Sequence, residues 1–400
     1  MKTAMWLYLF MFLAFFDLHA QYPILTPFAM SLGAGPAFIG WMMGMYSLTH
    51  LPGNLLAGVL VDRNGSRRYI VFALTIAGLI LLLQAHAQLP WHLLVLRAAS
   101  GFALAFLSPA CMTLLASLSS DPATQGKYMS GNGIIHTLAS VVSPAAGAFI
   151  VAKAGYSGTF STLGWLLIFT GVMAFFSVPK HNPALALHKP ALPDKEKLQP
   201  GLAATAQPTV SRRYYLLPFF VSCSQGVLFF ELPLSQGQDG MVSTGILLSL
   251  LSLGALATLC LFFLNRFSPG IRIAAALLGM ALCFFTLAAF RSIPAGVVLF
   301  LLGSAKGVLF PAMASLFISL GSAGRLGRTF SLQSIAMSLG AFAGPVAAGQ
   351  LREYVSPYFI AFVLLMTALM LLPPGRSGRL SSYAPGWNSP CRLNATFPGE

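Results

Sequence analysis

The chain consists of long uncharged stretches separated by short segments that carry Lys, Arg, Asp or Glu. The stretch Leu18–Val61 contains none of these residues. Because a membrane-spanning helix needs about 20 apolar residues, this stretch can hold the end of one span and the whole of a second. Along the whole chain the pattern predicts twelve spanning helices, near residues 5–29, 37–61, 69–88, 92–116, 127–152, 159–178, 214–235, 242–264, 272–290, 294–320, 328–351 and 355–372.

The N-terminal stretch is predicted to stay in the protein as the first helix. Lys2 precedes an apolar run, as in a signal peptide, but Asp17 interrupts that run and apolar character continues to Met30. A signal peptide has a shorter apolar segment followed by a cleavage site of small residues.

The composition indicates an integral membrane protein. Of the 400 residues, 56% are hydrophobic and 8% are charged, whereas a soluble domain has roughly 25% charged residues. So few charges cannot cover the outside of a water-soluble fold, which argues against soluble enzymes and nucleic-acid-binding proteins. We therefore expect an all-α fold in the lipid bilayer. The five cysteines are scattered, and their spacing matches neither a metal site nor a disulfide framework.

The basic residues predict the orientation in the membrane. If the N-terminus is cytoplasmic, 18 of the 23 Lys and Arg residues fall in cytoplasmic segments and 3 fall outside, with Arg97 and Lys306 inside spans. Cytoplasmic loops carry an excess of Lys and Arg, so this bias favours a cytoplasmic location for both termini. It also explains the net charge of +14 without a nucleic-acid partner.

The chain is predicted to have two related halves, at residues 1–178 and 214–372. The segment 179–213 is rich in Pro, Lys and Ala and is interpreted as a cytoplasmic linker, and 373–400 as a disordered cytoplasmic tail. Residues in the fourth and fifth predicted helices recur 202 or 201 positions later, as in the pairs Gly101/Gly303, Pro109/Pro311, Gly126/Gly327 and Pro144/Pro345. This shared register indicates a duplication, which places a binding site between the halves near the membrane midplane.

The segment between the second and third predicted helices carries a specific motif. It reads Gly-Val-Leu-Val-Asp-Arg-Asn-Gly-Ser-Arg-Arg over residues 58–68. It resembles the loop signature of the major facilitator superfamily, whose matching positions here are Gly58, Asp62, Arg63, Gly65, Arg67 and Arg68. The resemblance covers about residues 1–372 and implies two pseudo-symmetric six-helix bundles. Arg97 and Gly101 resemble the Arg-x-x-x-Gly element of the same superfamily. The second-half copy of the loop motif is reduced to Asn265-Arg266.

Two proline motifs resemble those of the superfamily's drug exporters. The fifth predicted helix contains Pro144 and Gly147, similar to the antiporter motif, although Ser143 stands where Gly is expected. The eleventh contains Gly344 and Pro345, a closer copy. Prolines and glycines at such positions allow the bends and close helix crossings of a rocking bundle, although static bundles also contain kinked helices.

The resemblance implies a gate at the cytoplasmic side. In the superfamily the carboxylate at the position of Asp62 holds the halves together when the gate is shut, and its partner is the start of the eleventh helix, here near residues 327–329. Arg325 and Arg328 would add positive charge there. Gly58 would allow close helix approach, and Gly65 suits a tight turn. The alternative is an ordinary turn with solvated charges.

Four ionisable residues lie within predicted spans. Each costs about 2.5–3.5 kcal/mol at a helix centre, so it should face a cavity or a partner. The four are Asp17, Arg97, Glu231 and Lys306. Asp17 and Gln21 are four residues apart and share a helix face, and with Arg97 and Lys306 they are candidate substrate-binding residues. Burial favours the neutral form of a carboxyl group, so Asp17 and Glu231 are candidate proton carriers. Alternatively, Asp17 only pairs with a buried base, and Glu231 only reaches external water.

The basic members have two possible roles each. The resemblance implies that Arg97 helps to couple protons to cargo, and the alternative is that it snorkels to the outer surface. Lys306 either binds an anionic group of the substrate or neutralises Asp17 or Glu231. The side chains of His19 and His136 titrate near neutral pH and are candidate proton relays, although most histidines on apolar helices are simply packed.

These features together predict a proton-coupled secondary transporter that exports a small organic or amphiphilic compound by alternating access, as a monomer in the cell membrane. The alternative is proton-driven import of an anionic nutrient, with Arg97 and Lys306 as anion ligands. A non-transporting receptor or membrane enzyme is a third possibility. The sequence has no Walker A motif, metal-ligand cluster or nucleophile motif. We therefore expect no cofactor, no metal and no catalytic residue.

Overall fold

The structure is a computed structural model that describes residues 2–119, 121–179, 212–236, 240–261, 266–290, 293–320 and 326–372. Almost all of the predicted linker at 179–213 and the whole predicted tail at 373–400 lie outside the described residues. The same is true of Asn265 and Arg325, and of the side chains of Asp62 and Arg328.

All regular structure within these ranges is helical. The elements in chain order are α1 (Lys2–Ala20), α2 (Tyr22–Ser31), α3 (Pro36–Asn64), α4 (Ser66–Gln84), α5 (Pro90–Leu104), α6 (Leu107–Ser117), α7 (Pro122–Ser177), the short 3₁₀ helix η2 (Arg212–Tyr215), α9 (Leu216–Gln236), α10 (Met241–Leu259), α11 (Pro269–Ala289), α12 (Ala295–Leu320), α13 (Leu326–Leu351) and α14 (Pro357–Met370).

These helices confirm the twelve predicted spans. In the described part of the chain, nine helical segments are long and apolar enough to cross a membrane. One of them, Gly131–Ser177, has 47 residues and holds two spans. The remaining two spans are α3, which is long but more polar, and α14, which is a shorter apolar helix.

Two spans that were predicted as continuous helices are broken. The first is divided at Gln21 into α1 and α2, and Pro23 lies in the first turn of α2. The fourth is divided into α5 and α6, and Pro109 follows the break. Proline lacks a backbone N–H and its ring collides with the preceding turn, which favours a break there, although α3, α7 and α13 continue through Pro52, Pro144 and Pro345. Gln21, at the first break, is buried in the bundle.

The fifth and sixth spans follow each other directly within α7. They are separated by a kink at Gly155, where φ is 69° and ψ is −178°. Side chains other than hydrogen are disfavoured in this conformation, which is why glycine stands there. The helix also begins at Pro122, earlier than the predicted start near residue 127.

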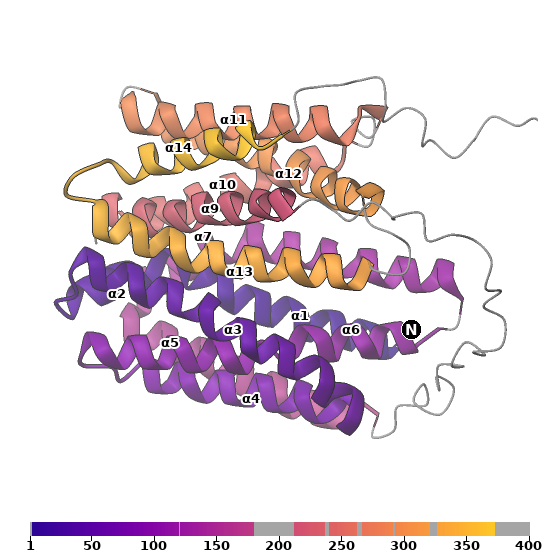
Figure 1. Ribbon diagram of the computed structural model, residues 1–400. Coiled ribbons are helices and arrows are strands. Elements are labelled where there is room, and N and C mark those ends of the chain that lie inside the picture. The colour runs from indigo at the N-terminus through magenta and orange to yellow at the C-terminus, as the bar shows by residue number, and fades with distance from the viewer. Residues whose placement is uncertain are drawn as a thin grey trace, which may run out of the picture.

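The helices form two groups of six spans. In Figure 1 the N-terminal helices α1 to α6 lie in the lower part of the bundle, and α11, α12 and α14 lie in the upper part. The two groups meet mainly where α3 packs against α13 and where α7 packs against α10. These are the second span against the eleventh and the fifth against the eighth, so the two contacts are equivalent when the halves are exchanged. The packing thus agrees with the duplication read from the sequence.

The two ends of the bundle differ in how closely the halves approach. We call the end that holds the α3–α4 turn and the start of α13 the motif end. At the opposite end the two backbones touch: a β-carbon on Gly349 would lie 2.6 Å from the carbonyl oxygen of Pro36, and one on Gly245 would lie 2.6 Å from that of Pro144. Near the motif end, a β-carbon on Gly58 would meet nothing within 4 Å. The close helix contact expected at Gly58 is therefore absent, because this residue lies on an exposed face of α3.

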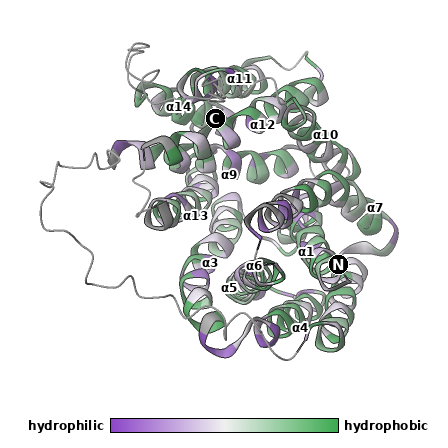
Figure 2. Ribbon diagram, turned by 90° about the vertical axis from the view of Figure 1, so that its right-hand side faces the viewer, coloured by the Kyte–Doolittle hydropathy of each residue, from purple (hydrophilic) through white to green (hydrophobic). Residues whose placement is uncertain are grey.

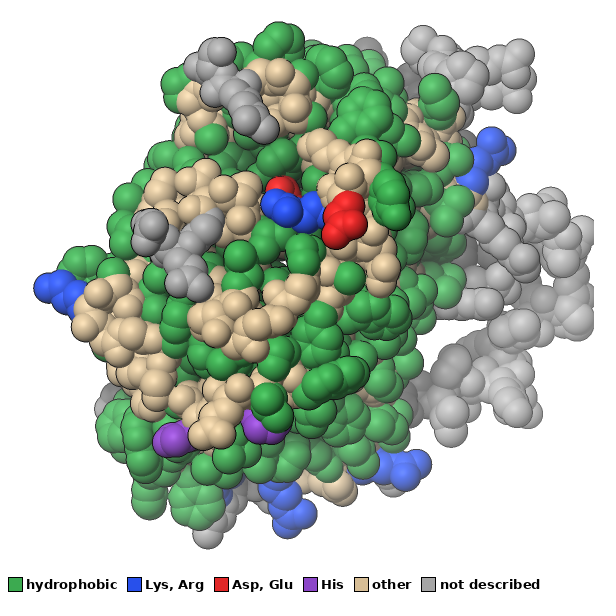
Figure 3. All heavy atoms as spheres, turned by 90° about the vertical axis from the view of Figure 1, so that its left-hand side faces the viewer, with side chains coloured by type: hydrophobic (Ala, Val, Ile, Leu, Met, Phe, Trp, Pro, Cys, Tyr) green, Lys and Arg blue, Asp and Glu red, His purple; other side chains and the backbone are tan. Residues whose placement is uncertain are grey.

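The outer surface suits a lipid environment. Hydrophobic residues run along the outer faces of the helices in Figure 2. Large apolar side chains such as Phe176 and Met370 are exposed there. Figure 3 views the opposite end and shows mostly hydrophobic and neutral side chains with few charged ones.

Candidate functional site

The centre of the bundle contains a chain of three polar side chains. The side-chain amide of Gln21 donates a hydrogen bond of 2.9 Å from Nε2 to Oδ1 of Asp17. Its oxygen accepts a hydrogen bond of 2.9 Å from Nη1 of Arg97. All three side chains are buried, with exposed fractions of 1–2%. Gln21 thus connects a carboxylate to a guanidinium that lies 76 residues away in the sequence.

The local sequence explains why these groups meet. Asp17 and Gln21 share a helix face as predicted, and the break before α2 holds Gln21 at the centre of the first span. Gly101 lies one turn after Arg97, and a β-carbon there would collide with the carbonyl oxygen of Tyr46. Because glycine leaves this space open, α5 approaches α3 closely enough to bring Arg97 into the cluster.

Arg97 does not snorkel to the surface. Its guanidinium carbon lies 4.6 Å from the centroid of the Tyr46 ring, a geometry in which the ring face attracts the cation. Within the described residues, Oδ2 of Asp17 and Nε of Arg97 have no hydrogen-bond partner. The cluster therefore retains one acceptor and one donor for a proton, a water molecule or a substrate.

Two cavities lie in the interior near this cluster; Arg97 lines the first of them, whereas Asp17 and Gln21 line neither. The first, which we call the Arg97 lobe, has a volume of about 370 Å³ and is lined by Arg97, Tyr46 and His50 from the first half and by Gln225, Ser338 and Pro345 from the second. The second, the Lys306 lobe, has a volume of about 540 Å³ and is lined by His19, His136, Pro144, Leu248, Lys306 and Phe310. Both volumes lie in the range of sites for small molecules.

The two lobes share a wall. Leu18, Tyr22, Gln225, Phe229 and Met337 line both of them. The rings of Tyr22 and Phe229 stack with centroids 4.2 Å apart and planes 1° apart. One ring belongs to each half of the protein, so the wall lies at the interface between the halves.

The histidines face the Lys306 lobe. The His19 and His136 rings lie edge to face with centroids 5.2 Å apart, and Phe15 packs on His136 at 4.6 Å. Nδ1 of His19 lies 2.7 Å from the carbonyl oxygen of Phe15. His19 thus lies on a different face of α1 from Asp17 and lines the Lys306 lobe.

Glu231 has a partner within its own half. Its carboxylate accepts two hydrogen bonds from Arg352, of 3.0 Å from Nε and 3.2 Å from Nη2. Glu231 is 6% exposed and lines neither lobe, and its partner Arg352 has a side chain that is 34% exposed. Lys306 neutralises neither Glu231 nor Asp17, since no ion pair joins it to them in the described structure.

The glycine–proline motifs lie at helix crossings. Gly147 packs against Ala20, whose carbonyl oxygen would be 2.6 Å from an added β-carbon. Gly344 packs against the backbone of Cys223, and Pro345 contacts Gly40 and Gly226 from the two halves. These residues hold the helices close together around the central cavities.

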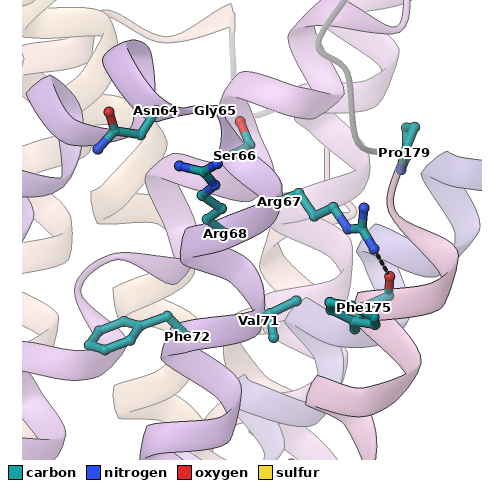
Figure 4. Close-up of a pocket in the computed structure, with 9 residues that line it drawn as sticks. All are labelled: Asn64, Gly65, Ser66, Arg67, Arg68, Val71, Phe72, Phe175 and Pro179. Carbon is teal, nitrogen blue, oxygen red and sulfur yellow. Dashed lines mark hydrogen bonds between the residues drawn. The ribbon is translucent and has the colours of Figure 1, made fainter.

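The loop motif forms a separate site at the motif end. A cavity of about 550 Å³ is lined by residues that include Gly65, Arg67, Arg68, Phe72 and Phe175, and it shares no residue with either lobe. Arg67 donates a hydrogen bond to the carbonyl oxygen of Phe175, and its guanidinium lies over the Phe175 ring (Figure 4). Gly65 has a φ of 85°, as a tight turn requires. The side chains of Asp62 and Arg328 are not among those described, so the gate contact stays a prediction.

The cavities also contain polar residues that the sequence did not single out. They are neutral side chains within apolar helices, namely Tyr22, Tyr46, Asn132 and Gln225. Amides within spans are a signal that a search restricted to charged residues misses. The described residues contain no group of three or more His, Cys, Asp or Glu side chains that could hold a metal ion.

Comparison with known proteins decides the family. A family model described as Major Facilitator Superfamily matches residues 7–345. The chain belongs to the Major Facilitator Superfamily. As a member of this superfamily it is a multi-pass membrane transporter and not an enzyme, which confirms the resemblance carried by the loop motif.

Relatives of known sequence match part of this superfamily member. The multidrug resistance protein MdtG of Citrobacter koseri is 30% identical over 168 residues, which make up 41% of each chain. MdtG of Salmonella paratyphi B is 29% identical over 167 residues, again 41% of each chain. The chain thus matches about two fifths of the length of these curated relatives.

Solved structures show the same fold over nearly the whole length. A bacterial homologue of the human lysosomal transporter Spinster, in an inward-facing and occupied conformation, has a TM-score of 0.69 at 14% identity and covers 92% of this chain and 93% of its own. The inward-open xylose transporter XylE from E. coli has a TM-score of 0.69 at 14% identity, with coverages of 95% and 98%. The human organic anion transporter MFSD10 has a TM-score of 0.61 at 17% identity, with coverages of 93% and 99%.

Proposed function

We propose that this transporter exports a small organic or amphiphilic compound from the cell in exchange for protons. The observation that carries the proposal is the buried chain of Asp17, Gln21 and Arg97, whose last member lines a cavity of substrate size at the interface of the two halves. The relatives named multidrug resistance protein MdtG support the direction of transport. The excess of Lys and Arg in one set of loops supports a motif end that faces the cytoplasm.

Asp17 is the proposed proton carrier. When its carboxyl group is ionised, Gln21 links it to Arg97 and the cluster is neutral overall. A proton on Asp17 removes the negative charge that faces Arg97 and leaves a net positive charge. Since an uncompensated charge in the membrane interior is costly, protonation changes the relative free energies of the conformations.

The arrangement of the lobes supports alternating access. Beyond the lobes, the halves are tightly packed at the opposite end, where Gly349 meets Pro36. Towards the motif end, the lobes extend to Ser334 and Asn132, near the starts of α13 and α7. With the motif end in the cytoplasm, the structure corresponds to a state closed to the outside. Asp62, in the motif at that end, is the proposed residue that holds the cytoplasmic gate shut in the other state.

Everted membrane vesicles test the coupling. Moving one proton inward across 100 mV supplies about 2.3 kcal/mol, which corresponds to an accumulation ratio of about 50-fold for a neutral compound. We expect energised vesicles with the wild-type protein to accumulate the compound and Asp17→Asn to abolish that accumulation. Glu353→Gln removes an exposed carboxylate as the matched control and should transport normally. Uphill transport by Asp17→Asn at the wild-type level contradicts the proposal.

A second candidate function is proton-driven import of an anionic nutrient. The observation that favours it is the presence of two cations, Arg97 and Lys306, in the adjoining lobes. The direction of flux separates the two functions. Uptake into right-side-out vesicles, driven by an inward proton gradient and absent from everted vesicles, supports import.

A further inference from the structure

The Lys306 lobe contains a positive charge without a counter-ion. The ammonium group of Lys306 lines this cavity and lies 5.8 Å from the centroid of the Phe310 ring. In the described part of the chain it forms no hydrogen bond and no ion pair. A lysine inside a spanning helix usually has a partner or marks a binding site, because its charge is poorly solvated there.

The carboxylates of the described spans are committed elsewhere. Asp17 accepts from Gln21 in the cluster that contains Arg97, and Glu231 accepts two hydrogen bonds from Arg352. Neither carboxylate lines the Lys306 lobe. The partner of Lys306 is therefore not supplied by the described walls of the cavity.

Other polar groups of the lobe also suit an anion. Gln225 Nε2 is a buried donor without a hydrogen-bond partner in the described structure. The imidazole rings of His19 and His136 line the same cavity. The remaining wall combines the neutral polar residues Asn132, Thr137, Ser140 and Ser252 with apolar residues that include Leu248, Phe310 and Met337. A cavity that combines a cation and hydrogen-bond donors with apolar side chains matches a molecule with a charged head and an apolar body.

We propose that the Lys306 lobe binds the anionic head of the cargo, a carboxylate, sulfonate or phosphonate attached to an aromatic or aliphatic body. This assignment rests on the proposed function, because it makes the cavity the transport site. It fits an exporter electrically: the inside-negative membrane potential itself drives an anion outward. It also assigns proton binding to the first half, which contains Asp17, and anion binding to the second half, which contains Lys306. The first half has no equivalent lysine, because Leu104 stands at the position that corresponds to Lys306.

The test compares two ligands that differ in charge and little in shape. Naphthalene-2-sulfonate and naphthalene-2-sulfonamide are titrated calorimetrically into the full-length protein in lipid nanodiscs at pH 7, without any ion gradient. We expect the sulfonate to bind at least tenfold more tightly, because hydrogen bonds to charged groups are stronger than those between neutral groups. Equal affinities, or no binding of the sulfonate at millimolar concentration, overturn the proposal.

Variants assign the preference to one side chain. Lys306→Met should abolish the preference for the sulfonate, and Lys306→Arg should retain it. Lys153→Met removes a lysine that lies on an exposed part of α7 and lines neither lobe, so the preference should stay unchanged. A preference that persists in Lys306→Met refutes the assignment. If Lys306→Met does not fold, the wild-type ratio and Lys306→Arg still decide the question.

The binding test is independent of the coupling test. Binding is measured at equilibrium, so it does not require proton exchange. If Asp17→Asn exports normally while the sulfonate preference holds, proton coupling through Asp17 is wrong and the anion site stands. If Asp17→Asn fails to export and the sulfonate has no advantage, the anion site is wrong and the coupling proposal stands.

Discussion

A valine at Gly40 is expected to open the end of the bundle that is closed in this structure. Gly40 lies on α3 where the helix crosses α13, and a β-carbon there would collide with the carbonyl oxygen of Pro345. It would also lie 3.1 Å from the carbonyl carbon of Pro345 and 3.3 Å from Cα of Val346. All three are backbone atoms, so no side-chain rotation relieves the collision.

The geometry sets the size of the effect. Carbon atoms pack best at about 3.5–4.0 Å, so α3 and α13 must separate at this crossing, and the two methyl groups of valine require still more space. Overpacking of this kind costs about 1–3 kcal/mol. This free energy destabilises only the conformation in which α3 and α13 touch at this crossing. The ratio of the conformation open at the opposite end to the closed one therefore rises by about 5–150-fold.

Distances between spin labels measure this shift. Labels at Ser31 and Tyr354, which are exposed near the opposite end on different halves, report its opening by double electron–electron resonance in a chain without native cysteines. We expect Gly40→Val to increase the long-distance population. Gly58→Val places the same side chain on the same helix where nothing lies within 4 Å, and should not increase it. Identical distance distributions for the two variants would refute the steric argument.

Two stability predictions follow from side chains outside the cavities. Arg352→Gln should lower the melting temperature by the equivalent of about 1–3 kcal/mol, because it leaves the buried carboxylate of Glu231 without its partner. Glu231→Gln combined with Arg352→Gln should recover part of the loss, and a double variant as unstable as Arg352→Gln alone contradicts this reasoning. Gly155→Ala should cost about 1–3 kcal/mol through its backbone conformation alone. Gly133→Ala, equally unobstructed but without a positive φ, is its control and should be neutral or stabilising in the same thermal assay.

The sequence was sufficient to predict the number of spans and the family. The thickness of the bilayer sets the length of each apolar span independently of the other spans. Each span can therefore be recognised from its own stretch of sequence. The loop motif at residues 58–68 then identified the superfamily. The breaks within the first and fourth spans were harder to predict from the sequence. Pro23 and Pro109 stand in the sequence, but only the structure shows that the first and fourth spans are each divided into two helices near them.

The composition of the site could be predicted only in part. The sequence indicated Asp17, Gln21 and Arg97 as candidates, and the structure joins them through hydrogen bonds. Their connection depends on how α5 rotates against α1 and α3, which hydropathy does not determine. For the same reason, the sequence did not predict the ion pair between Arg352 and Glu231. Arg352 follows the end of α13, and Glu231 lies in α9, 121 residues earlier in the chain.

The stacked rings of Tyr22 and Phe229 have a consequence for cargo size. The rings are anchored to α2 and α9, one in each half, and the proposed alternating access moves these halves against each other. Such a movement separates the two rings or slides one over the other, because each ring is attached to a different half and their centroids are only 4.2 Å apart. The wall between the Arg97 lobe and the Lys306 lobe then loses this stack. In the proposed cycle, a cargo that occupies both lobes in this structure is therefore released from a single, wider cavity in the other state.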